Sequence, residues 1–145
     1  MRQLIWFRTD LRVQDNSALA AAMQAGATIA LFIITPGQWL AHDDAASKVD
    51  FWLRNLRALQ SRLAQLNVPL LIRRAENWDE VPALLAELCR AQAIECVQVN
   101  EEYGVNETRR DHEVAALLRA SGVAFRHHVD QLLFSPGTIL TRSGG

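Results

Sequence analysis

The sequence predicts an α/β fold, built as a doubly wound, five-stranded parallel sheet with helices on both faces. Two observations predict it. Five short segments are rich in Val, Ile, Leu or Phe and show little polar alternation, which is typical of strands covered on both faces. Segments with the apolar periodicity of amphipathic helices lie between them, and this alternation implies βαβ units with right-handed crossovers. For 145 residues we expect a single domain spanning residues 1–145.

The expected strands are Gln3–Phe7, Thr28–Ile34, Pro69–Arg73, Ile94–Asn100 and Val123–His127. Each is short and apolar, and each is followed by polar or turn-forming residues. Because the strands should be parallel, the segments that follow them should meet at one edge of the sheet, where open α/β sheets bind their ligands.

The expected helices are Ser17–Gln24, closed by Gly26, then Ala45–Leu66, a helix that starts near Asn77 and runs through Leu88, and Val105–Ala120. Asp15, Asn16 and Ser17 all suit the N-cap of the first helix. Asn77 and Glu80 match a capping box at the third. Gly122 suits the C′ position after the last helix.

Composition and charge exclude several classes of function. The net charge of −1 predicts no bulk attraction to nucleic acid. Cys89 and Cys96 are not in a metal-ligand spacing, and we expect both to be buried thiols in a reducing cytosol. No apolar run is long enough to cross a bilayer, so we expect a cytoplasmic protein without a membrane partner.

The motifs of common nucleotide-binding and hydrolytic enzymes are missing. There is no G-x-G-x-x-G after the first strand and no P-loop, and the first turn carries carboxylates where a phosphate needs bare N–H groups. There is no G-x-S-x-G elbow. His127 and His128 are adjacent in a strand and should point to opposite faces, so they do not form a two-ligand metal site. We therefore expect neither catalytic residues nor a metal.

Polar residues follow three of the expected strands. The first strand breaks into Arg8, Asp10, Arg12 and Asp15, the second leads into 35–42, and the fourth leads into 100–107. A carboxylate in such a crevice is a natural acceptor for the guanidine-like N–H pair of a pterin edge.

Structural explanations of the same residues compete with this one. For the charges at 8–15 we favour pairing with one another at the sheet edge. Asn106 and Glu107 also suit the first turn of any helix. A solvated loop residue is the default interpretation of His42, and we expect Trp39 to anchor its loop and Trp6, Trp52 and Trp78 to pack in the core or on helix faces.

Four sequence blocks match one family in order and spacing. They are W-F-R-x-D-L-R-x-x-D-N at Trp6–Asn16, T-P-x-Q-W-x-x-H at Thr35–His42, V-N-E-x-x-R-D at Val105–Asp111 and S-P-G at Ser135–Gly137. Together they resemble the N-terminal antenna domain of the photolyase/cryptochrome family, specifically that of folate-using bacterial photolyases for cyclobutane pyrimidine dimers. The likeness covers essentially the whole chain.

The resemblance implies a binding domain and not a catalytic one. In this family the α/β domain, which is Rossmann-like, holds the antenna chromophore 5,10-methenyltetrahydrofolate in a shallow cleft. By this resemblance Glu107 should accept hydrogen bonds from the pterin, with Asn106 as a polar neighbour and His42 over or beside the folate.

The same resemblance assigns the other parts of the repair machinery elsewhere. FAD, the groove for damaged DNA and the electron-transfer tryptophans should belong to a C-terminal helical domain that is absent from this chain. The parent protein should be a blue-light-driven DNA repair lyase, and these residues alone should not repair DNA. Two alternatives stay open, a cryptochrome-type photoreceptor domain and a stand-alone Rossmann-like binding module.

Overall fold

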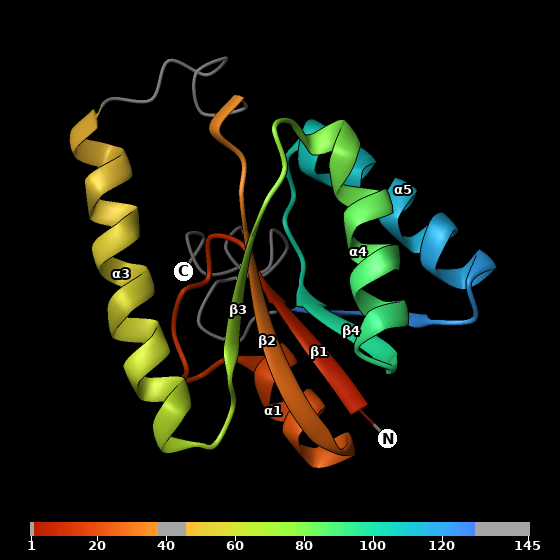
Figure 1. Cartoon of the computed structure of the whole chain (residues 1–145), viewed down its shortest axis with the longest axis horizontal. Helices are drawn as coiled ribbons and strands as arrows, with labels where there is room; N and C mark the ends of the chain where they lie inside the picture. Colours follow the sequence, from red (N-terminus) through yellow and green to blue (C-terminus); the bar gives the residue numbers. More distant parts are fainter. Residues whose placement is uncertain (1, 38–45, 130–145) are drawn as a thin grey trace, which may run out of the picture.

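Five parallel strands form the centre of the molecule. A computed structural model describes residues 2–37 and 46–129. The strands are β1 (Arg2–Phe7), β2 (Ala27–Ile34), β3 (Leu70–Arg74), β4 (Ile94–Asn100) and β5 (Ala124–His128), in the order β3-β2-β1-β4-β5 (Figure 1). All four strand pairs are parallel. The predicted sheet is confirmed, and each predicted strand boundary is within one residue of the observed one.

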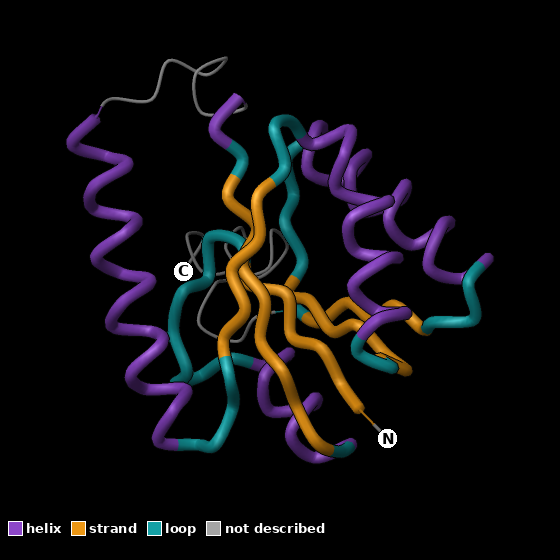
Figure 2. The backbone as a smooth tube through the Cα atoms, in the orientation of Figure 1, coloured by secondary structure: helices purple, strands orange, loops and turns teal. Residues whose placement is uncertain are grey.

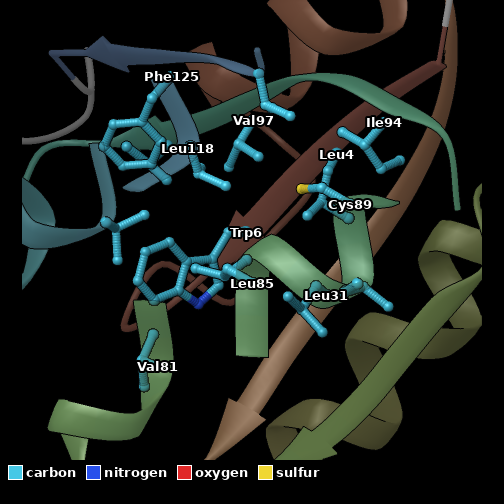
Figure 3. Close-up of a cluster of buried hydrophobic side chains, with 14 of the residues drawn as sticks. Leu4, Trp6, Leu31, Val81, Leu85, Cys89, Ile94, Val97, Leu118 and Phe125 are labelled. Atoms are coloured by element: carbon cyan, nitrogen blue, oxygen red, sulfur yellow. The ribbon is translucent and has the colours of Figure 1, made fainter. Parts of the chain in front are cut away.

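Helices cover both faces of this sheet, as predicted. They are α1 (Ser17–Ala25), α3 (Ala46–Gln65), α4 (Val81–Ala91) and α5 (Val105–Ala120) (Figure 2). Ile5 and Phe7 of β1 pack in one apolar cluster with residues of α1 and α3. Leu4 and Trp6, which alternate with them along β1, pack in a second cluster with residues of α4 and α5 (Figure 3). The sheet is therefore doubly wound, with α1 and α3 on one face and α4 and α5 on the other.

The helix termini agree with the sequence except at α4. Asn16 caps α1, because its Oδ1 accepts a hydrogen bond from the backbone N–H of Leu19 at 3.0 Å. Gly122 follows α5 with φ +81°, the left-handed conformation that glycine adopts without strain.

The capping box expected at Asn77 is not formed. A 3₁₀ turn, η1 (Trp78–Glu80), precedes α4, and the Asn77 side chain caps neither helix. The Glu80 carboxylate instead accepts a hydrogen bond from the backbone N–H of Glu76, at 2.9 Å. The pairing is displaced by one residue because η1 separates Asn77 from the first turn of α4.

Among the helices of the described ranges, none is both long and apolar enough to span a membrane. His42 and Trp39 and the S-P-G block at Ser135–Gly137 lie outside the described residues.

Candidate functional site

A buried ionic cluster lies where β1 and β4 end and α5 begins. Arg8, just after β1, donates to Oδ1 of Asp111 at 2.8 Å and to the backbone carbonyl of Asn100 at 2.6 Å. Arg110 donates from Nε to the same Asp111 oxygen at 3.1 Å, and from Nη2 to Oε1 of Glu102 at 2.6 Å. We call Arg8, Glu102, Arg110 and Asp111 the arginine cluster. Its two guanidinium groups and two carboxylates balance in charge, which permits their burial.

Asn100 connects this cluster to the first helix. Its Oδ1 accepts the backbone N–H of Ala18 at 3.0 Å, and its Nδ2 donates to Asp10 Oδ2 at 2.7 Å and to Asn16 Oδ1 at 2.8 Å. Asp10 in turn accepts the backbone N–H of Arg8 at 2.9 Å. The end of β4 is therefore joined to the β1–α1 turn by side chains whose polar atoms are satisfied inside the protein.

The pairing predicted among the charges at 8–15 is wrong for Arg8, although its side chain is buried in ionic contacts at the sheet edge. Arg8 forms its ion pair with Asp111 and not with an aspartate of its own loop. Arg12 donates to the backbone carbonyl of Asp15, and not to its carboxylate, at 3.3 Å. The Arg8 pairing joins residues 103 positions apart, a contact that local sequence does not encode.

Two tryptophans stack on the arginines of the cluster. The Arg8 guanidinium carbon lies 4.6 Å from the Trp6 ring centroid, and that of Arg110 lies 5.1 Å from Trp6 and 4.5 Å from Trp78. Cation–π contacts of this kind favour a fixed guanidinium plane. Trp6 is buried, as predicted.

A small cavity opens beside this stack, at the carboxyl edge of the sheet. Its volume is about 110 Å³, which is below the roughly 300–1,000 Å³ of typical small-molecule pockets. Three segments meet there as predicted, since Arg8 comes from the end of β1, Thr35 from the end of β2 and Glu107 from the start of α5. Trp6, Trp52 and Trp78 supply aromatic surface to its wall.

Comparison with known proteins assigns the chain to a family. A model of the DNA photolyase family matches residues 3–145. The chain belongs to the DNA photolyase family.

Curated relatives of this photolyase family cover nearly the whole chain. A deoxyribodipyrimidine photo-lyase of Vibrio cholerae is 34% identical over 98% of the chain. Cryptochrome-1 of Arabidopsis thaliana is 35% identical over 97% of it. The chain spans only 30% of the first relative's length and 20% of the second's.

A solved structure supports the same fold. The crystal structure of an archaeal photolyase from Sulfolobus tokodaii with two FAD molecules superposes with a TM-score of 0.76. The sequences are 24% identical, and the match covers 94% of this chain and 31% of that one.

Asn106 and Glu107, the pair expected to contact the pterin, lie in the first turn of α5. Asn106 is exposed, whereas Glu107 is partly buried and lines the cavity. The N-cap of α5 is Gly104, and no side chain caps it, so capping does not account for either residue. Within the described ranges, the Glu107 carboxylate has no hydrogen-bond or ion-pair partner. Glu107 is therefore a cavity-lining carboxylate that no described residue neutralises.

The cysteines and the adjacent histidines of the described residues do not form a second site. Burial raises the pKa of the Cys89 thiol to about 12, so this cysteine is unreactive, and both cysteines are buried as predicted. His127 packs edge-on against Phe125, whereas His128 contacts Gln98 at 2.6 Å, which confirms that the adjacent histidines face opposite sides. The described part of the chain contains no group of side chains suited to a metal.

Sequence reasoning missed the arginine cluster. Arg110 and Asp111 belong to the quoted V-N-E-x-x-R-D block, but the block gave them no role, and nothing singled out Glu102. The adjacent Arg-Asp pair one turn after Glu107 was the available signal. This signal could be interpreted only with the knowledge that Arg8 lies beside Asp111 in the folded chain.

Proposed function

We propose that this chain is the antenna-chromophore domain of a light-driven DNA photolyase and binds 5,10-methenyltetrahydrofolate at the carboxyl edge of its sheet. One observation carries the proposal. Glu107 presents a carboxylate at the rim of the cavity that has no partner among residues 2–37 and 46–129, in a chain of the photolyase family. Such a carboxylate suits the paired N–H donors of a pterin edge, and Asn106 supplies a polar neighbour.

The cavity cannot enclose this ligand, so the proposed site lies on the surface at the cavity rim. A volume of about 110 Å³ is too small for a whole folate. The ligand would therefore lie across the rim, over the first turn of α5, with only an edge near Trp78 and Glu107. His42 would lie over or beside the folate, as the family resemblance implies.

The chain's own residues would bind and orient the chromophore and perform no bond chemistry. When bound, the pterin would supply absorption of blue light for transfer to FAD. The FAD and the damaged DNA would be held by a C-terminal helical domain of the same protein. The lengths of the relatives support this division, since the chain matches less than a third of each.

The test is a titration of the natural protein with 5,10-methenyltetrahydrofolate. The near-ultraviolet absorbance of the bound pterin reports binding and gives the affinity. Glu107→Gln keeps the size of the side chain and removes its charge, and we expect folate binding to weaken roughly tenfold. Glu113→Gln is the matched control, because Glu113 is an exposed carboxylate on the same helix. Equal affinity of the Glu107 variant and the control would refute the assignment.

A cryptochrome-type photoreceptor is the second candidate, because Cryptochrome-1 of Arabidopsis is as similar to the chain as the photolyases are. A light-dependent repair assay of thymine dimers with the natural protein separates the two. Repair supports the photolyase, and folate binding without repair supports the photoreceptor.

A further inference from the structure

The cavity wall holds more charge than its ion pairs use. Arg8, Arg110, Glu102 and Glu107 all line it. Arg110 follows Glu107 by three positions on α5, a spacing at which oppositely charged side chains of a helix normally pair. In a helix taken alone, Glu107 and Arg110 would therefore be expected to neutralise each other.

Other contacts engage Arg110 instead. Its Nη2 donates to Glu102 and its Nε donates to Asp111, while its plane stacks between Trp6 and Trp78. The Arg110 side chain is only 5% exposed, so these contacts lie away from solvent screening.

Arg8 is engaged through its terminal nitrogens, which donate to Asp111 and to the carbonyl of Asn100. Its Nε is buried without a hydrogen-bond partner in the described structure and lies 4.0 Å from Oε1 of Glu102. Two carboxylates thus balance both guanidinium groups of the wall, and Glu107 remains as the excess negative charge.

The Glu107 side chain is also turned away from Arg110. A Cβ atom at position 104 would clash with Oε1 of Glu107, so the carboxylate lies directly over Gly104. Gly104 precedes α5, whereas Arg110 follows Glu107 by about one turn. The carboxylate is therefore directed toward the exposed N-terminal end of the helix.

We propose that Glu102 is a positioning residue of the antenna site, because together with Asp111 it holds Arg110 away from Glu107 and keeps that carboxylate free for the ligand. This inference rests on the proposed function and adds the source of its specificity. A carboxylate without a protein cation selects an edge that presents N–H donors and disfavours an anionic one.

A rescue experiment tests the positioning role. In the natural protein, Glu102→Gln removes the charge that holds Nη2 of Arg110, so Arg110 becomes available to Glu107. We expect binding of 5,10-methenyltetrahydrofolate to weaken roughly fivefold. The double variant Glu102→Gln/Arg110→Met removes the competing cation and should restore affinity to within about twofold of the unmodified protein.

Matched variants separate this effect from damage to the fold. Glu101→Gln changes the neighbouring carboxylate of the same loop, which contacts neither arginine in the described structure, and should bind folate normally. Thr9 is exposed, and its hydroxyl donates to Glu102 at 2.8 Å. Thr9→Val removes this hydroxyl and should weaken folate binding, but less than Glu102→Gln does. Circular dichroism and thermal unfolding establish that each variant is folded.

The outcomes distinguish this inference from the proposed function. If Glu107→Gln leaves folate binding unchanged, the proposed site itself is refuted. If Glu107→Gln weakens binding while Glu102→Gln and Thr9→Val do not, the site stands and the positioning role is refuted. Weakened binding in Glu102→Gln that Arg110→Met fails to restore also refutes it, because the loss would then not pass through Arg110.

Discussion

Two arginine–aspartate pairs in this protein use the same chemical groups in opposite surroundings. Arg8 and Asp111 lie 2.8 Å apart, with side chains 5% and 3% exposed. Arg54 and Asp50 lie 3.2 Å apart on the outer face of α3, with side chains 69% and 67% exposed. The first pair joins β1 to α5 across the sheet edge, and the second joins successive turns of one helix. Burial and connectivity, and not the pairing itself, decide what each contributes.

The buried pair is the more sensitive of the two because its loss leaves uncompensated charge. Asp111 accepts hydrogen bonds from two guanidinium groups, so its removal leaves Glu102 as the one carboxylate of the arginine cluster beside Arg8 and Arg110. The exposed pair is solvated in either state, and water and salt replace the lost partner at little cost.

The largest expected effect is that of Asp111→Ala. Removing one partner of a buried ion pair costs about 3–5 kcal/mol of unfolding free energy, and we expect a loss in that range by urea denaturation. A loss below about 1 kcal/mol, the value typical of exposed pairs, would show that the buried pair behaves like a surface one and would remove the contrast.

His128 is an intermediate case, because it is half-buried and hydrogen-bonded but has no ionic partner within residues 2–37 and 46–129. Burial is the main cause that lowers its pKa, and the positive charge of Arg126 and the neighbouring His127 lower it further. Because the folded-state pKa is below the unfolded value of about 6.5, protonation favours the unfolded chain. Its contribution to stability is therefore complete above that value and is lost as the pH falls through it.

We expect the thermal unfolding midpoint of the natural protein to decrease as the pH is lowered from 7.5 to 5.5. The midpoint of the His128→Gln variant should depend less on pH over this range. His112→Gln is the control, because His112 is exposed on α5. An identical pH profile in the His128 variant and the unmodified protein would contradict the assignment.

The smallest expected effect is that of Asp50→Ala. An exposed ion pair between successive helical turns contributes about 0.3–0.5 kcal/mol, so the urea midpoint should barely move and the small change should vanish in high salt. A loss comparable to that of Asp111→Ala would show that burial does not set the strength of these pairs.

Much of the candidate site could be predicted from sequence because it is carried by local signals. The order of strands and helices placed the segments after β1, β2 and β4 at one edge, and the cavity does bring Arg8, Thr35 and Glu107 together there. The cap at Asn16 could also be predicted, since it satisfies a backbone N–H three residues away. His42 lies outside the described residues, and its part in the site stays a prediction.

The partners of the buried charges could not be predicted in this way. The alternating charges after β1 suggested pairing within their own loop, but Arg8 meets Asp111, and Asn100 meets Asp10. Local sequence does not show which partner a charged side chain will have, because an arginine can donate to any carboxylate that packing brings within reach. The partners are set by packing, when the helices cover the sheet edge and exclude water from it.

The sequence by itself determined the parallel sheet, its helices and the edge at which a ligand would bind. Periodicity and capping act over a few residues, so they can be seen in the chain. The tertiary structure alone decided which carboxylates balance the arginines and which one is left over. That depends on residues about a hundred positions apart becoming neighbours, and it leaves the Glu107 carboxylate, unlike those of Glu102 and Asp111, without an ion-pair partner among the described residues.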